Sequence, residues 1–353
     1  MRRPLPSPAL QRAKRMTRSL TLVNVLLRYI WSYIKINKNV TGFKRAHALH
    51  TPRVRLRPAS WADVVLGGPD TADGSYSTAA LSATATGGDT VTSGGLTGIS
   101  LWGFLGGGLI TNTPAGDNTN NPILRYYIVT TDASGNQSVV SLGEIDPNFG
   151  TASPAAFVAN RNTGGLLATP SLIVPNQPER DLNNLTSLQI LSVPALPREP
   201  ENVASTSVAL SGNVKAPGSY NLAGLEAFTP VNELVGTDTC SGVPLWTFLG
   251  ATGGVNQIVT TVGTDGYEVV LALAELDPND GGNANDLLPY ADTTGAFPGD
   301  ALARTIYPTD NKHGRWESNL DIVTVTEAPE PASLAVLAVA VTAFGAARRR
   351  RAC

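Results

Sequence analysis

The stretch that decides the fold reads IVTTVGTDGYEVVLALAELDP, residues 258–278. Two runs rich in β-branched and apolar residues, Ile258–Thr261 and Tyr267–Leu273, flank the triplet TDG at 264–266. Short runs of this kind are typical of strands, and an Asp-Gly pair between them is a signal for a hairpin turn. The segment therefore predicts a β-hairpin, with Glu275 at the end of its apolar run.

A related segment, IVTTDASGNQSVVSLGEIDP, lies earlier in the chain at residues 128–147. Three further blocks recur in the same order: 74–81 at 218–225, 101–106 at 245–250, and Pro175, Arg180, Asn184 and Leu185 at Pro308, Arg315, Asn319 and Leu320. Shared composition does not produce four blocks in one order, so the sequence indicates an internal duplication.

The fold class that we expect is α+β, mainly β, with two homologous compact domains and a single C-terminal transmembrane helix. Low charge and abundant Gly and Pro agree with many short strands joined by turns. The predicted parts are a basic N-terminal region at 1–62, the first repeat at 63–193, a linker at 194–204, the second repeat at 205–327 and a C-terminal signal at 329–351.

Charge is strongly segregated along the chain. Residues 1–62 hold 14 Lys/Arg and no Asp or Glu, whereas residues 63–331 hold 8 Lys/Arg against 28 Asp/Glu, a net charge of −20. A body of this sign repels phosphate backbones, so we expect no nucleic-acid partner.

The end of the chain has three parts in a fixed order. Pro329, Glu330 and Pro331 precede an uncharged apolar segment at 332–347, and the arginines Arg348, Arg349, Arg350 and Arg351 follow it. As a helix this segment would be about 24 Å long, slightly short of a hydrocarbon core of about 30 Å. The arginines orient it with this end in the cytoplasm, so the acidic body is expected on the other side of the membrane.

This order resembles the PEP-CTERM sorting signal of Gram-negative bacteria, which is read by the membrane protease-transpeptidase exosortase. The resemblance implies that Pro329, Glu330 and Pro331 are recognition residues. It also implies a transient inner-membrane anchor, followed by release to the cell surface or the extracellular exopolysaccharide matrix. The partners expected on this basis are exosortase, the Sec translocon, the inner membrane and exopolysaccharide. A plain tail anchor behind a chance Pro-Glu-Pro is the alternative.

The start of the chain supplies a poor export signal. Its best apolar run, Leu20–Leu27, contains Asn24 and is followed at once by Arg28. The small-x-small form at 60–62 resembles a signal-peptidase site, but basic residues precede it where an apolar region is needed. Two interpretations stay open: residues 1–58 are a wrongly assigned start, or residues 20–34 form an uncleaved anchor.

The second repeat also resembles small exported relatives of the molybdopterin-binding domain of sulfite oxidase-like enzymes. The motifs that carry this resemblance are GNVKAPGSY at 212–220, TCSGVPLW at 239–246 and DGY at 265–267. The resemblance implies that Cys240 falls near the thiolate that binds molybdenum, whereas the first repeat has Leu96 there. Few cations surround it to hold an anionic pterin, so we expect no molybdopterin and no metal, and a buried or half-buried thiol.

Charged residues recur at matching positions of the two repeats. Glu144 and Glu275 end apolar runs, and Arg180 and Arg315 follow them. Because arginine pairs with carboxylates in a fixed geometry, these residues predict structural ion pairs, with a shared ligand site as the alternative. The acidic run at 277–286 lacks the spacing and the closing Glu of a calcium loop, which favours a solvated turn.

Together these observations favour an exported surface or matrix protein with a binding or structural role over an enzyme. The alternative is an exported oxidoreductase with a degenerate molybdopterin site centred on Cys240. The sequence does not identify a ligand, an oligomeric state or the anchor that follows cleavage.

Overall fold

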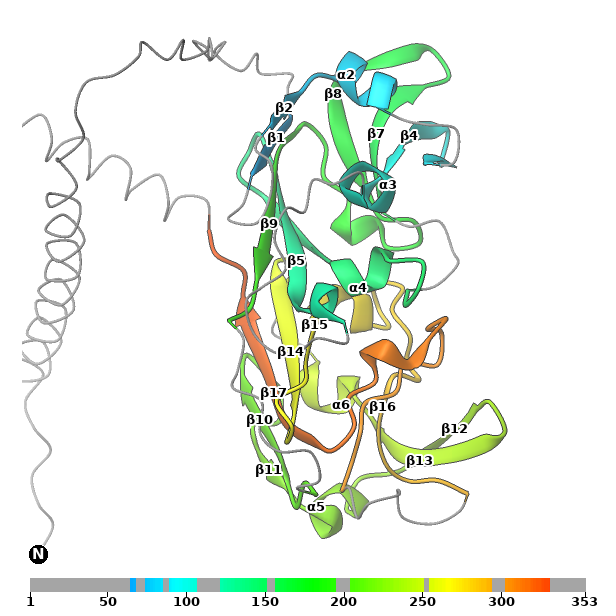
Figure 1. Ribbon diagram of the computed structural model, residues 1–353, viewed down its shortest axis with the longest axis vertical. Coiled ribbons are helices and arrows are strands. Elements are labelled where there is room, and N and C mark those ends of the chain that lie inside the picture. Colours follow the sequence, from blue (N-terminus) through cyan, green and yellow to red (C-terminus); the bar gives the residue numbers. More distant parts are fainter. Residues whose placement is uncertain are drawn as a thin grey trace, which may run out of the picture. The chain divides into compact units, whose positions relative to one another are not determined.

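Strands dominate the described structure, which confirms the prediction of a mainly β fold (Figure 1). The computed structural model describes residues 64–67, 74–84, 89–106, 121–150, 156–194, 204–250, 254–293 and 302–330. The predicted N-terminal region, the predicted membrane segment at 332–347, Pro331 and the four terminal arginines lie outside these ranges. Within them, every helix is too short or too polar to cross a bilayer.

The first repeat builds a five-stranded sheet with the order β2-β1-β9-β5-β6. These strands are β2 (Gly74–Tyr76), β1 (Val64–Gly67), β9 (Leu185–Ser192), β5 (Tyr126–Asp132) and β6 (Gln137–Ser141). The β1–β9 pair is parallel and the other pairs are antiparallel. All of β6 and nearly all of β5 are buried, including the polar residues Gln137, Ser138 and Ser141 of β6.

The second repeat builds a five-stranded sheet with the matching order β11-β10-β17-β14-β15. Its strands are β11 (Gly218–Tyr220), β10 (Val208–Gly212), β17 (Leu320–Glu327), β14 (Gln257–Gly263) and β15 (Glu268–Ala272). Again one pair, β10–β17, is parallel. The predicted hairpin is confirmed as the antiparallel pair β14–β15.

A smaller sheet accompanies each large one. The first is β3 (Thr90–Ser93), β4 (Leu96–Ser100), β7 (Phe157–Asn162) and β8 (Gly165–Ile173); the second is β12 (Val231–Val235), β13 (Asp238–Pro244) and β16 (Leu287–Ala291). The α-helices are short: α2 (Thr78–Thr84), α3 (Leu101–Gly106), α4 (Leu142–Ile145), α5 (Leu222–Glu226) and α6 (Trp246–Leu249). Single 3₁₀ turns complete the fold: η2 (Pro122–Arg125), η3 (Pro178–Arg180), η4 (Leu273–Leu276) and η5 (His313–Arg315).

Two asparagines at corresponding positions adopt the same unusual backbone conformation. Asn184 has φ 56° and Asn319 has φ 54°, in the left-handed region that asparagine tolerates better than most residues. Each carbonyl accepts a hydrogen bond of 3.0 Å from a hairpin, from Ala133 N in one case and Thr264 N in the other. The chain therefore enters β9 and β17 in the same way.

Three hydrophobic clusters form the core. One lies mainly within each repeat, and a third joins them. We call this third contact the seam; its buried members are Tyr127, Val129, Val139, Ile258, Val270, Ala272 and Ala328. The described residues between Val64 and Glu330 accordingly fall in one compact unit that is not divided between the repeats. The organisation into two separate compact domains stays a prediction.

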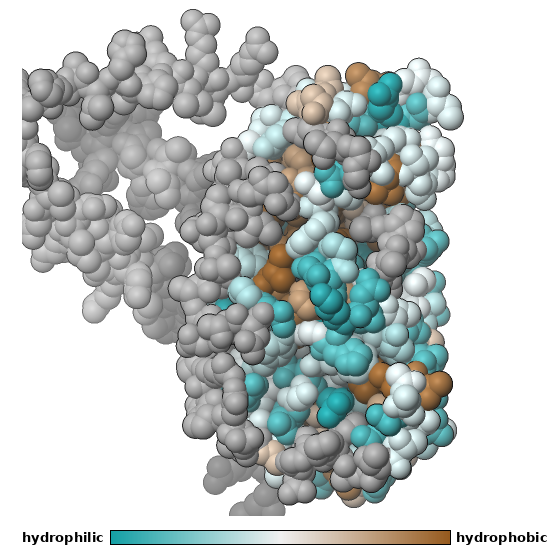
Figure 2. All heavy atoms as spheres, turned by 45° about the vertical axis from the view of Figure 1, so that its right-hand side comes forward, coloured by the Kyte–Doolittle hydropathy of each residue, from teal (hydrophilic) through white to brown (hydrophobic). Residues whose placement is uncertain are grey.

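Hydrophobic side chains outside the core are scattered. Figure 2 shows them in small separate groups among hydrophilic residues on the face that it draws. The large exposed ones in the described ranges are Val65, Leu166, Leu222 and Leu234, which belong to four different elements. Single exposed apolar residues are normal and do not mark an interface.

Candidate functional site

The two matched glutamates lie next to the seam, each in the short helical turn after a buried strand. Ser141 caps α4: its Oγ accepts a hydrogen bond from Glu144 N at 3.1 Å, and Glu144 Oε1 accepts one from Ser141 N at 2.8 Å. In the second repeat Ala272 has no hydroxyl, but Glu275 Oε1 still accepts a hydrogen bond from Ala272 N at 3.0 Å. This local capping geometry fixes both carboxylates close to the strand ends.

Arg180, in η3, is fully buried and binds Glu144 with two nitrogens. Nη1 donates to Glu144 Oε2 at 2.9 Å, and Nη2 donates to Oε1 at 2.6 Å. Nη2 also donates to the Val139 carbonyl at 2.6 Å, and Nη1 to Gln177 Oε1. A buried guanidinium paired in this bidentate way is matched in charge and largely in hydrogen bonds.

Arg315, in η5, forms ion pairs with two carboxylates, whereas Arg180 pairs with one. Nη1 donates to Glu275 Oε2 at 2.8 Å, while Nε and Nη2 donate to Asp310 at 2.9 and 2.6 Å. The guanidinium carbon also lies 5.2 Å from the centre of the Tyr307 ring. The structure thus brings together Glu144 with Arg180 and Glu275 with Arg315, as the sequence suggests, and adds Asp310.

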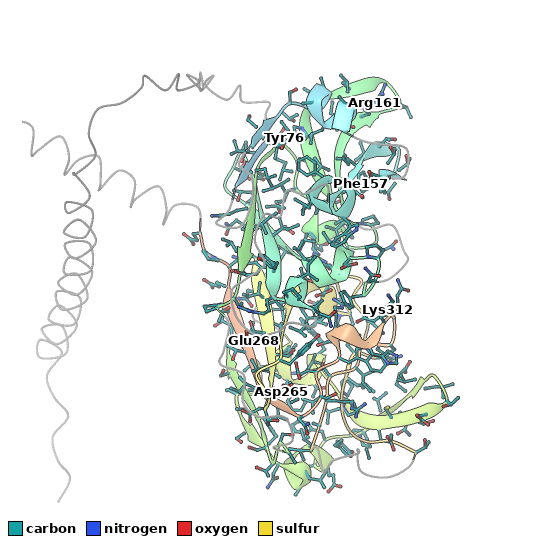
Figure 3. All side chains as sticks on the ribbon, in the orientation of Figure 1. Tyr76, Phe157, Arg161, Asp265, Glu268 and Lys312 are labelled. Carbon is teal, nitrogen blue, oxygen red and sulfur yellow. The ribbon has the colours of Figure 1, made fainter. Side chains whose placement is uncertain are left out.

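Polar contacts across the seam join the two pairs. Ser141 Oγ donates to Glu275 Oε1 at 3.1 Å, and Gln177 Nε2 donates to the Ala274 carbonyl at 3.3 Å. A further ion pair links Arg125 Nε to Glu268 Oε2 at 3.1 Å, with both side chains almost completely buried. Glu268 lies at the start of β15 (Figure 3). Sequence reasoning missed this pair, although a charged residue beside a buried strand is a usable signal.

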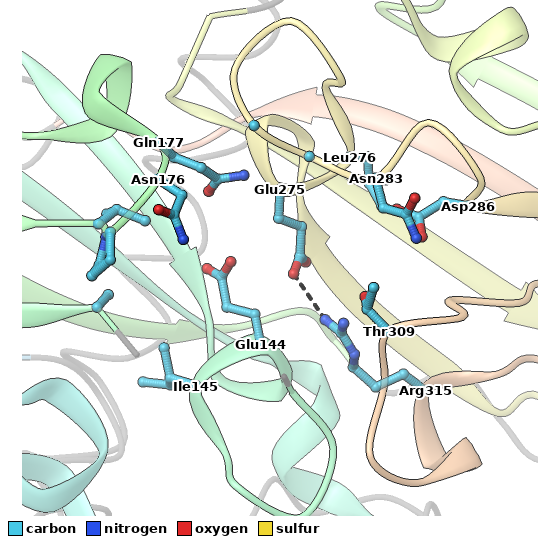
Figure 4. Close-up of a pocket in the computed structure, with 15 residues that line it drawn as sticks. Glu144, Ile145, Asn176, Gln177, Glu275, Leu276, Asn283, Asp286, Thr309 and Arg315 are labelled. Carbon is cyan, nitrogen blue, oxygen red and sulfur yellow. Dashed lines mark hydrogen bonds and ion pairs between the residues drawn. The ribbon is translucent and has the colours of Figure 1, made fainter. Parts of the chain in front are cut away.

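A pocket of about 340 Å³ opens between these residues. Figure 4 shows Glu144 and Glu275 facing each other across it, with Thr309, Arg315 and Asp286 along one wall. Within the described residues its lining contains no aromatic ring. The pocket therefore combines both repeats in one polar site, which a repeat taken alone would not form.

Asp286 is the functional candidate that sequence reasoning missed. It is only 5% exposed, and within the described structure its Oδ1 has no hydrogen-bond partner. Its carbonyl accepts from Leu245 N at 2.7 Å, just as Ala156 accepts from Leu101 N at 2.9 Å in the first repeat. The solvated-turn interpretation of 277–286 is thus wrong for Asp286, because the bond to Leu245 draws this end of the run inside.

Burial alters the acidity of two pocket carboxyls. It raises the pKa of Asp286 to about 8; the nearby Glu275 and Asp310 add to this rise, and Arg315 opposes it. Burial likewise raises the pKa of Glu275 to about 7, with Arg315 opposing and Glu144 adding. Near neutral pH the pocket can therefore gain or lose protons.

Cys240 lies apart from this pocket, on β13, and is buried. Burial raises the pKa of its thiol; Arg304 lowers it, whereas Asp292 and Asp238 add to the rise. A thiol kept protonated beside two aspartates does not suit a molybdenum thiolate or an anionic pterin. Across the described ranges, no group of three or more His, Cys, Asp or Glu is placed to bind a metal ion.

The Pro-Glu-Pro tripeptide, predicted to be a sorting motif, begins two residues after β17 ends at Glu327. Ala328 is buried in the seam, and its N–H donates to the Asn256 carbonyl at 2.9 Å. Pro329 and Glu330 are exposed, with one hydrogen bond of 3.4 Å from Gln137 Nε2 to the Pro329 carbonyl.

No protein-family model matches this chain, and a search of curated proteins found no significant match. Its function is therefore inferred from the chemistry of its own residues.

Proposed function

We propose that this chain is an exported surface or matrix protein, delivered by a PEP-CTERM-type signal, with a binding or structural role. The observation that carries the proposal is the order of three features at 329–351: the Pro-Glu-Pro tripeptide, an apolar segment and an arginine cluster. The acidic body agrees with a location opposite the arginines.

The exposure of Pro329 and Glu330 supports this proposal. Only Ala328, which is buried in the seam, separates them from the exposed Thr326 and Glu327 at the end of β17. A membrane protease would reach this segment while the sheets remain folded, because neither proline can donate a backbone hydrogen bond to them.

The body of the protein is, in this proposal, a pair of homologous β-rich domains related to the sulfite oxidase-like fold. Their matching strand orders and the left-handed Asn184 and Asn319 support a duplication. Buried, charge-matched pairs such as Arg180–Glu144 suit a structural purpose, which favours a role without catalysis.

The test is to compare Glu330→Ala with the matched control Glu327→Ala, since both glutamates are exposed. Each full chain is produced in a Gram-negative host that carries an exosortase, followed by cell fractionation and intact-mass measurement. We expect the parent chain and the control to lose the C-terminal segment and leave the inner membrane. We expect Glu330→Ala to stay in the membrane at full mass.

Two results together would contradict the sorting proposal. If Glu330→Ala and a chain lacking 332–353 both show the parent's location and mature mass, the sorting proposal is wrong.

A further inference from the structure

The pocket at the seam contains more negative than positive groups. Arg180 is paired with Glu144, and all three nitrogens of Arg315 donate to Glu275 or Asp310. Asp286 is then left without a cation of its own, and in the described structure its Oδ1 accepts no hydrogen bond. A buried acceptor without a donor is costly, so a native protein that keeps one needs a reason for it.

The shape of the pocket limits what can supply the missing donor. Its volume of about 340 Å³ admits a small molecule. Two glycines form part of its wall: a Cβ on Gly281 would lie 2.2 Å from the Asn176 carbonyl oxygen, and one on Gly282 would lie 2.6 Å from the Glu275 carbonyl oxygen. Side chains at these positions would force the wall apart, so the cavity depends on both glycines.

The chemistry of the lining excludes several ligand classes. Once ionised, the carboxylates of Glu144, Glu275 and Asp286 would repel an anion. A neutral sugar usually stacks on an aromatic ring, and the described lining has none. A metal ion needs several free ligands close together, and no such group occurs in the described ranges. A small organic cation remains, because it satisfies both the charge and the missing hydrogen bond.

We propose that this pocket binds a small organic cation with a primary ammonium group, and that the Asp286 carboxylate is its principal anionic contact. Glu275 supplies further negative charge, and Asn283 and Thr309 offer polar atoms along the same wall. This inference gives the binding role proposed above a site and a ligand class, and it rests on that role. Binding by the purified protein is measured apart from delivery, so either proposal can fail alone.

Proton linkage gives this binding a characteristic pH dependence. The groups that act on Asp286 are Arg315, Glu275 and Asp310, and burial holds its pKa at about 8. An ammonium ion pairs with the ionised carboxylate, so binding releases a proton below that pH. Affinity should therefore rise from pH 6 to pH 8.5, and fall only when the amine itself loses its proton.

The experiment is calorimetric titration of the purified full chain in detergent with 4-aminobutan-1-ol. Butane-1,4-diol, which replaces the ammonium by a hydroxyl, is the matched neutral probe. At pH 8 we expect the amine to bind at least tenfold more tightly than the diol. At pH 6 we expect the amine to bind at least tenfold more weakly than it does at pH 8. Asp286→Asn should lose at least tenfold in affinity, and Asp280→Asn, in the same loop but outside the lining, should bind like the parent chain.

Thermal unfolding shows that each variant is folded before titration. No amine binding by the parent, equal binding of amine and diol, or unchanged binding by folded Asp286→Asn would each overturn the proposal. Binding of calcium chloride with greater affinity than the amine, lost in Asp286→Asn, would also overturn it, because the site would then be a metal site.

Discussion

The two halves of the central pocket have the same framework and different charge. In the first repeat, Arg180 meets one carboxylate, Glu144, and the neutral Gln177. In the second repeat, Arg315 meets Glu275 and Asp310, and the pocket carries Asp286 as well. The comparison teaches that a duplicated ion pair can stay structural in one copy while the other copy gains carboxyl groups that outnumber its arginine.

Replacing each arginine should have the largest effect on stability, and it tests the difference between the two repeats directly. Arg180→Met should cost about 3–5 kcal/mol in the free energy of unfolding, because it leaves Glu144, whose side chain is only 14% exposed, without its partner. Arg315→Met should cost more, because it leaves both Glu275 and Asp310 unpaired. Chemical denaturation at pH 7 measures both losses.

The control is the double variant Arg180→Met with Glu144→Leu, which removes both charges together. It should recover most of the loss, since an apolar replacement of a buried ion pair is often neutral. If both arginine variants lost less than about 1 kcal/mol, these ion pairs would be no stronger than ion pairs on a protein surface, which would contradict a buried network.

The pH dependence of stability is a second test of the difference between the two repeats, because Asp286 belongs only to the second one. The folded pKa of Asp286, about 8, lies above its ordinary value, so the folded protein holds a proton that the unfolded chain releases. Stability from this group is complete below the ordinary carboxyl pKa and is lost as pH rises through about 8. One such proton gives a slope of about 1.4 kcal/mol per pH unit. Between pH 5 and 8, Asp286→Asn should therefore reduce the slope of the unfolding free energy against pH by up to this amount.

Unfolding free energies at unit pH intervals test this prediction, with Asp321→Asn on β17, outside the pocket, as the control. The control should keep the parent slope, and part of the slope should survive in Asp286→Asn because the pKa of Glu275 is also raised. Parallel curves for the parent and Asp286→Asn would refute the pKa assignment.

The smallest expected effect concerns the capping position. Ser141→Ala removes the hydroxyl that accepts from Glu144 N and donates to Glu275, so we expect a loss of about 1–2 kcal/mol. Ala272→Ser should change stability by less than about 1 kcal/mol, because Glu275 already accepts from Ala272 N. Thermal unfolding compares them; a larger change for Ala272→Ser would contradict this difference between the repeats.

The local features of this fold could be predicted from the sequence, because they depend on neighbouring residues. The β14–β15 hairpin follows from two apolar runs around an Asp-Gly turn. The charged partners Glu144 and Arg180 were identified from their recurrence at Glu275 and Arg315.

The surplus charge could not be predicted, because it depends on contacts between distant segments. Asp286 lies in a run of turn-forming residues, and its burial accompanies a hydrogen bond to Leu245, which is 41 positions earlier in the chain. The Arg125–Glu268 pair joins two repeats whose mutual contact leaves no mark in the sequence. Self-similarity reveals that two copies exist, but it carries no information about the surface through which they meet.

The position of β17 has a mechanical consequence. This strand lies between β10, to which it is parallel, and β14, to which it is antiparallel, and Ala328 at its end is buried in the seam. A pull applied at Glu330 would load two ladders of hydrogen bonds in shear at once, rather than peel an edge strand away one bond at a time. The chain thus leaves this sheet from an interior strand and not from an edge strand.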